Sequence, residues 1–126
     1  MTIQLQQISG STTEASIRTH RILIDRPTEK GGSDAGPMGG ELFLASLGGC
    51  FMSNLLAAIR ARDLGINGVQ TEVTGVLADS PTRSESVELR ISADTLDREL
   101  LDKLVEIADR GCIRYRDGSC AAGFKR

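Results

Sequence analysis

The longest feature of the sequence is an apolar stretch without charge, Leu42–Ile59. Apolar side chains recur there on every face of a helix, a pattern typical of a helix that is buried all round. The helix is predicted over Pro37–Arg62, with Glu41 in its first turn and Gly65 as its left-handed stop. Small and polar residues interrupt the run, which falls at or below the roughly 20 apolar residues that a bilayer requires. The pattern therefore predicts a core helix rather than a membrane span.

Two adjacent glycines, Gly48 and Gly49, precede Cys50 near the middle of this helix. Each costs about 1 kcal/mol relative to Ala in a helix interior. We therefore expect another backbone or a ligand to approach the helix closely at this point.

Strand-like alternation precedes the helix. Two runs, residues 3–8 and Ile17–Asp25, are separated by turn residues at Gly10–Thr13, which predicts a β-hairpin. The Gly- and Pro-rich segment Pro27–Gly40 has no hydrophobic period and is predicted to be a loop. Loops of this length inside a compact domain are often functional.

The pattern after the helix predicts two more strands and a second helix. Val69–Gly75 and Val87–Ile91 alternate apolar and polar residues, so each run is expected to bury one face. Asp94 and Thr95 are candidate caps for a helix whose apolar stripe runs over Leu96–Ala108. The tail beyond it has the composition of a short strand with a turn.

Composition narrows the classes of partner. With 126 residues the chain is predicted to form one domain, residues 1–126. The net charge is -2, from 15 basic and 17 acidic residues mixed along the chain, so we expect neither a nucleic-acid nor a membrane partner. A polar, alternating segment follows Met1, and we therefore expect no signal peptide and a cytoplasmic location.

The chain contains three cysteines, Cys50, Cys112 and Cys120. In a reducing compartment three cysteines indicate free or reactive thiols rather than a disulfide framework. Cys50 is either a small buried hydrophobe or a reactive thiol. Cys112 follows directly after the helix-ending Gly111, and a redox pair would require the two Cα atoms within about 4.4–6.8 Å, which spacing alone leaves open. Cys120 is most simply an exposed spare thiol.

Other kinds of site lack their signatures. His20 and the three cysteines have no paired CxxC or HxxxH spacing for zinc, so no metal is expected. Ser46 and Ser53 flank Cys50 but stand in no GxSxG motif. Patterns for dinucleotides and phosphates are missing as well, and no cofactor is expected.

Four pieces of the sequence together resemble the OsmC family, which includes the organic hydroperoxide resistance proteins. The first two are a strand that ends in D-x-P, at Ile24–Pro27, and a GG-x-D-x-GP loop, at Gly31–Pro37. The other two are an E-L-x-L-A-x-L-G-x-C helix, at Glu41–Cys50, and a cysteine after a late helix, at Ala108–Ile113. The resemblance covers almost the whole chain.

The resemblance implies an α+β fold with antiparallel sheets around a long buried central helix, in an intertwined homodimer. It implies that Cys50 is the thiolate that attacks the O–O bond of a hydroperoxide, and that Cys112 resolves the resulting sulfenic acid as a disulfide. A dithiol reductant, lipoyl or thioredoxin-like, would then restore the pair.

The sequence departs from the organic hydroperoxide branch at one position. That branch has a Glu ten residues before its first cysteine, paired with an activating Arg, whereas Gly40 stands there in this chain and Glu41 stands nine residues before. Nine residues correspond to about 13.5 Å of helical rise, on the opposite face of a straight helix. Glu41 would therefore act across the dimer two-fold, form a salt bridge elsewhere, or serve only as a charge at the helix N-terminus. The candidates for the activating Arg are Arg18, Arg21 and Arg26, of which we favour Arg18.

Two functions follow from these observations. The first is a thiol-dependent peroxidase that reduces organic hydroperoxides or hydrogen peroxide, with the site residues Cys50, Cys112, Glu41 and Arg18. The second is a non-catalytic dimer that binds a small apolar ligand at its interface.

Overall fold

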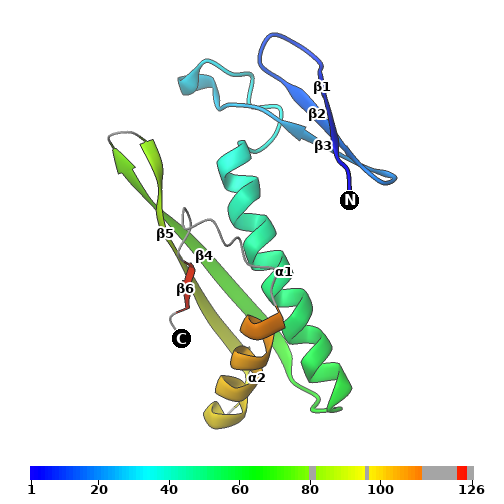
Figure 1. Ribbon diagram of the computed structural model, residues 1–126, viewed down its shortest axis with the longest axis vertical. Coiled ribbons are helices and arrows are strands. Elements are labelled where there is room, and N and C mark those ends of the chain that lie inside the picture. The colour runs from blue at the N-terminus through cyan, green and yellow to red at the C-terminus, as the bar shows by residue number, and fades with distance from the viewer. Residues whose placement is uncertain (80–81, 96, 112–121, 125–126) are drawn as a thin grey trace. The chain divides into compact units, whose positions relative to one another are not determined.

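The computed structural model describes residues 1–79, 82–95, 97–111 and 122–124 (Figure 1). These residues belong to two compact units, Met1–Phe43 and Leu44–Arg126. The expectation of one domain over residues 1–126 stays a prediction. Cys112, Cys120 and the predicted turn at Asp117 and Gly118 lie outside the described residues.

The first unit is a three-stranded antiparallel sheet followed by a loop. Its elements are β1 (Gln4–Gln7), β2 (Thr13–Ile17), β3 (His20–Ile24) and the short 3-10 helix η1 (Thr28–Lys30), with the strand order β1-β2-β3. The predicted hairpin was wrong in one respect, because Ile17–Asp25 is not one strand. The chain reverses at Arg18, whose φ of 54° supplies the left-handed conformation of a tight turn without a glycine.

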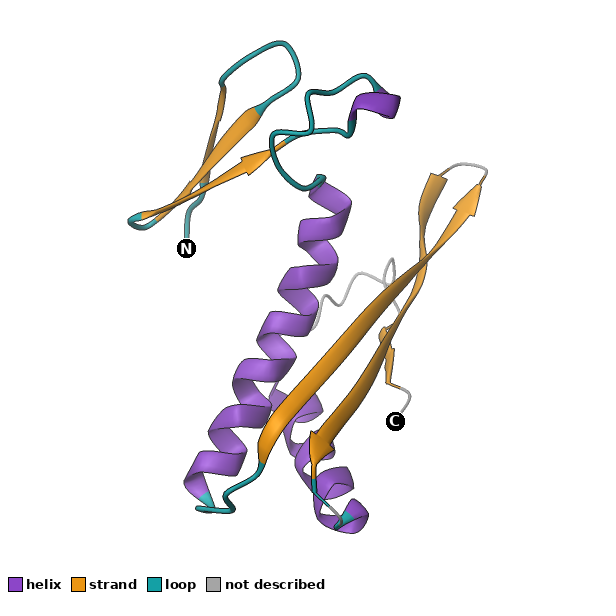
Figure 2. Cartoon of the chain, turned by 180° about the vertical axis from the view of Figure 1, so that it is seen from behind, coloured by secondary structure: helices purple, strands orange, loops and turns teal. Residues whose placement is uncertain are grey.

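The second unit packs helices on a sheet (Figures 1 and 2). Its elements are the part of α1 (Gly39–Ala61) from Leu44 on, β4 (Asn67–Asp79), β5 (Thr82–Asp94), α2 (Arg98–Gly111) and β6 (Ala122–Phe124). The long strands β4 and β5 pair antiparallel, and β6 pairs parallel to β5. Both helices lie on the same side of this sheet (Figure 2).

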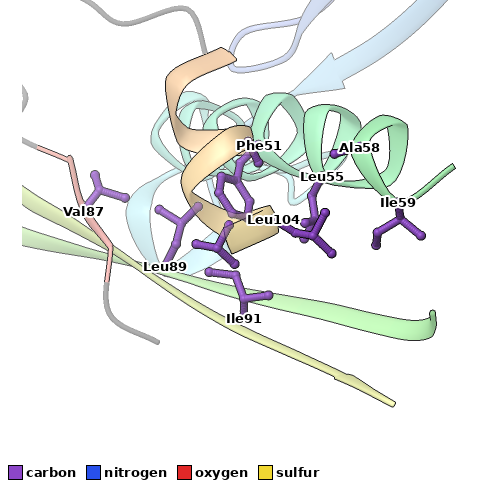
Figure 3. Packing of buried hydrophobic residues seen from close by; sticks show 10 residues of the cluster. Phe51, Leu55, Ala58, Ile59, Val87, Leu89, Ile91 and Leu104 are labelled. Atoms are coloured by element: carbon purple, nitrogen blue, oxygen red, sulfur yellow. The ribbon is translucent and has the colours of Figure 1, made fainter. Parts of the chain in front are cut away.

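The core of the second unit lies between the two helices and β5 (Figure 3). Phe51 and Leu55 of α1 point toward Leu89 of β5 and Leu104 of α2, and all four are almost completely buried. The predicted alternation in β5 and the predicted stripe on α2 from Leu100 to Ala108 are therefore confirmed, while Leu96 lies outside the described residues. The cap of α2 is Asp97, two residues after Thr95 and three after Asp94, because Asp97 Oδ1 accepts the Leu100 N–H at 3.0 Å.

Within one chain, α1 is buried along one face. Its buried residues are Gly48, Phe51, Leu55, Ala58 and Ile59. The opposite face carries small and apolar residues, and Leu56 there is 44% exposed. By length and composition α1 is also apolar enough to cross a membrane, but the core helix of a soluble protein meets the same criterion. The predicted burial of α1 on every face is therefore not found within one chain. It would require a further protein surface against the exposed face.

At Gly48, α1 lies close against the sheet. A Cβ at this position would lie 2.7 Å from Cγ2 of Val73 on β4, whereas a Cβ at Gly49 would meet nothing within 4 Å. A close approach is therefore found at Gly48, but the expectation was wrong about its nature, because the neighbour is a side chain and not a backbone or a ligand. Val73 is β-branched and stiff at χ1, so it has little freedom to move aside.

Gly48→Ala is expected to lower the free energy of unfolding by about 1–3 kcal/mol, because the added methyl group overpacks the contact with Val73. Urea denaturation followed by circular dichroism measures the change. Combining the substitution with Val73→Ala should recover most of the loss, since the obstructing methyl groups are then gone. A Gly48→Ala variant as stable as the wild type would contradict this packing.

Candidate functional site

Cys50 lies in the middle of α1 at the edge of its buried face. It is half-buried and is a free thiol, while its neighbour Phe51 is completely buried. One turn away on either side, Ser46 and Ser53 are exposed. Cys50 thus lies between the core of the second unit and the uncharged face of α1, which is exposed to solvent in a single chain. The approach of Cys112 to Cys50 stays a prediction.

Glu41 is exposed in the first turn of α1. Its Oε1 accepts the Met38 N–H at 2.9 Å, the reciprocal bond by which a residue in the first turn closes a helix N-terminus. The Leu42 N–H in turn donates to the Met38 carbonyl at 3.0 Å. The contact that the structure shows for Glu41 is therefore helix capping, and its predicted catalytic role stays a prediction.

The three candidate arginines stand in different environments. Arg18 is exposed in the turn between β2 and β3, and its predicted role stays a prediction. Arg21 donates to Glu14 Oε1 at 2.7 Å across the two strands. Arg26 is exposed at the start of the loop and lines a cavity together with the first residues of α1.

The loop between β3 and α1 is organised by Asp25, a residue to which the sequence analysis gave no role. Its side chain is 3% exposed, and Oδ1 accepts the Arg26 N–H at 2.7 Å. Its Oδ2 accepts the Thr12 hydroxyl at 2.9 Å and the N–H groups of Ser33 and Ala35 at 3.2 Å each. One buried carboxylate therefore ties the β1–β2 turn to the middle of the loop. One sequence feature could have revealed this role. Asp25 stands between a predicted strand and the Pro of a Gly-rich loop, and Asp side chains at such positions often accept hydrogen bonds from nearby backbone N–H groups.

Burial alone raises the pKa of the Asp25 carboxyl. Hydrogen bonds from the backbone of Arg26 and Ala35 and from the side chains of Thr12 and Ser11 outweigh it, and the pKa falls from its ordinary value of 3.8 to about 2. These donors favour the ionised form because a carboxylate accepts hydrogen bonds better than a carboxylic acid. Asp25 is thus a charged carboxylate at neutral pH.

Two cavities adjoin this loop. One, of about 490 Å³, is lined by Glu29, Lys30, Asp34 and Glu41 among others. The other, of about 470 Å³, lies beside Ser11, Arg26, Lys30 and the start of α1. Cys50 lines neither of these two cavities. Among the described residues, no group of three or more His, Cys, Asp or Glu side chains is arranged to hold a metal ion.

The fold and the site define an α+β protein with a free thiol in the middle of a long core helix. A family model described as OsmC-like protein matches residues 31–117, a region that spans parts of both units. The chain belongs to the OsmC family. The resemblance stated from the sequence and the predicted OsmC-like fold are both confirmed.

Solved structures with the same fold cover nearly the whole chain. A candidate osmotic stress-induced and detoxification response protein from Psychrobacter arcticus is 20% identical, with a TM-score of 0.81 over 98% of this chain and 93% of its own. An OsmC-like protein from Mycoplasma pneumoniae is 16% identical, with a TM-score of 0.78 and the same coverage. An organic hydroperoxide resistance protein from Legionella pneumophila is 18% identical, with a TM-score of 0.72 and again the same coverage. No curated protein matches the chain.

Asp25→Asn is expected to lower the free energy of unfolding at neutral pH and to lose this effect in acid. A carboxylate whose pKa is lowered in the folded protein stabilises it fully above the ordinary pKa, and the contribution disappears as pH falls from 3.8 to about 2. Urea denaturation at several pH values measures the difference between wild type and variant. Thr12→Val, which keeps the carboxylate, should retain most of the pH dependence. A difference that is constant across this range would contradict the assignment.

Proposed function

We propose that this protein is a thiol-dependent peroxidase that reduces organic hydroperoxides or hydrogen peroxide through Cys50 and Cys112. The observation that carries the proposal is the free, half-buried thiol of Cys50 in the middle of α1. The OsmC family, to which the chain belongs, includes organic hydroperoxide resistance proteins, and the Legionella pneumophila protein of the same fold carries that name. A half-buried thiol beside an uncharged surface suits a small apolar peroxide.

The reaction proceeds in three balanced steps. The Cys50 thiolate attacks one peroxide oxygen, so that an S–O bond forms, the O–O bond breaks, and the alkoxide leaves and takes a proton to become an alcohol. The Cys112 thiol then attacks the Cys50 sulfur, and water leaves as the disulfide forms. An external dithiol, lipoyl or thioredoxin-like, gives two electrons to this disulfide by thiol exchange and is itself oxidised. A dithiol of this kind is maintained in a reducing compartment, and we propose a cytoplasmic location.

A homodimer is part of this proposal. The uncharged face of α1 includes Ala45, Gly49, Ser53 and Leu56, all exposed in one chain, and it continues the apolar character that covers the rest of the helix. A second copy that packs α1 against α1 would bury this face and leave Cys50 at the margin of the interface. The intertwined dimer implied by the family resemblance has this arrangement.

The alternative is a non-catalytic dimer that binds a small apolar ligand in its interface. Two observations favour it. The Glu41 carboxylate caps α1, and Arg21 pairs with Glu14 rather than with Glu41. Under this alternative Cys50 serves as a packing residue.

Peroxide consumption by wild type and cysteine variants separates the two functions. With cumene hydroperoxide or hydrogen peroxide and dithiothreitol or dihydrolipoamide, Cys50→Ser should lose all activity above background because the nucleophile is gone. Cys112→Ser should form a sulfenic acid at Cys50, detectable by dimedone, but turn over slowly. Cys120→Ser is the control and should keep wild-type activity. Wild-type protein no faster than Cys50→Ser with either peroxide would refute the peroxidase and favour the binding alternative.

Leu56→Glu is expected to dissociate the proposed dimer. A carboxylate at this position would have to be buried without a partner, and we expect the dissociation constant to rise at least about 100-fold, equivalent to about 2.7 kcal/mol. Sedimentation velocity measures the change. Ile107→Glu on α2 is the matched control, since Ile107 is exposed to a similar degree, 38% against 44% for Leu56. Equal effects of the two substitutions would argue against an interface formed by α1.

A further inference from the structure

The peptide group between Pro37 and Met38 is held from both sides. Its carbonyl oxygen accepts the backbone N–H of Asp25 at 3.1 Å. Its N–H donates to Glu41 Oε1 at 2.9 Å. Because a peptide group is planar, rotating it to weaken one of these bonds weakens the other. The orientation of the Glu41 carboxylate therefore depends on the backbone at residue 25.

The backbone at residue 25 is in turn fixed by its own side chain. The Asp25 carboxylate binds Thr12 from the β1–β2 turn and Ser33 and Ala35 from the loop, as described above. The side chain thus holds the middle of the loop, and the N–H of the same residue holds its end at Pro37. One residue closes the loop at two points.

Two glycines restrict the loop to this arrangement. A Cβ at Gly36 would collide with the carbonyl of Leu23 on β3, and a Cβ at Gly32 would collide with the carbonyl of Arg26. The loop therefore lies directly against backbone, and the Asp34 N–H adds a bond to the Arg26 carbonyl at 3.0 Å. Loosening the carboxylate from the loop removes the bonds that keep these close contacts in place.

We propose that Asp25 is the positioning residue for Glu41, acting through the Pro37–Met38 peptide group and the loop that its carboxylate closes. The role needs a carboxylate rather than an amide. At least four donors converge on the two oxygens of Asp25, whereas Asn has one acceptor oxygen and would direct its NH₂ group at the N–H of Arg26 or at those of Ser33 and Ala35. The consequence for catalysis rests on the proposed function, but the effect on the position of Glu41 does not.

Amide hydrogen exchange of the full-length protein tests the inference. In Asp25→Asn the Met38 amide should exchange at least about tenfold faster, together with those of Ser33 and Ala35. Glu41→Ala is the control and should accelerate Met38 but not Ser33 or Ala35. The amides of Phe51 and Leu104 report whether the second unit remains folded. Unchanged exchange at Met38, with faster exchange at Ser33 and Ala35, would overturn the proposal.

If Asp25→Asn does not fold, a milder variant can be used for the same exchange measurement. Thr12→Val removes one of the donors to Asp25 and keeps the carboxylate, so it should accelerate the same three amides in the same direction, by at least about twofold. No acceleration at Met38, with faster exchange at Ser33 and Ala35, would overturn the proposal here as well.

A kinetic measurement tests the link to the reaction. If Asp25 acts through Glu41, then Asp25→Asn and Glu41→Ala should slow the reaction of Cys50 with cumene hydroperoxide by similar factors, and the double variant should be no slower than Glu41→Ala. Additive losses would overturn the positioning role in catalysis. Wild-type protein that does not react with the peroxide would refute the proposed function, while the exchange at Met38 would still decide whether Asp25 positions Glu41.

Discussion

The absence of charge along most of α1 is the constraint on which the rest of the molecule depends. A helix without charged residues over Leu42–Ile59 gains stability when apolar protein covers it. The sheet and α2 cover the face that carries Phe51 and Leu55, and Gly48 lets that face lie directly on Val73. The remaining face also lacks charge, and the same driving force supports the dimer proposed above. Cys50 stands on the boundary between the two faces, and its environment is therefore set by both.

The two units obtain their stability from different sources. The second unit has a conventional core, in which side chains from α1, β5 and α2 are buried together. Among residues 1–43, all of which the structure describes, the buried side chains are Thr12, Ala15 and Asp25. Two of these three are polar, and they bind each other. The first unit therefore relies on strand pairing and on one buried carboxylate, so its shape is more sensitive to a single polar substitution than that of the second unit.

This difference explains what the sequence predicted and what it did not. Alternation predicted β4 and β5, and helical spacing predicted α1 and α2, because burial of apolar side chains determines these elements. The strand Thr13–Ile17 was missed because its inward positions include the polar Thr13 and the small Ala15 and because the turn at Arg18 contains no glycine. The place of Cys50 near the middle of α1 followed from the sequence, whereas its role as the reactive thiol was implied by the family resemblance and stays a prediction. The role of Asp25 was not predicted, because its partners lie 8 to 13 residues away and converge only in the folded chain.

Helix capping by Glu41 is compatible with a role in the reaction. A carboxylate accepts about four hydrogen bonds, and the Met38 N–H takes one position on Oε1. Capping therefore orients the carboxylate and leaves it capacity to bind an arginine or a substrate proton. The position of the Glu41 carboxylate would then depend on the loop, and therefore on Asp25, rather than on the packing of the core. If the proposed function is correct, the packing of the core positions Cys50 and the hydrogen bonds of the loop position Glu41, so that a substitution can alter one of these positions without altering the other.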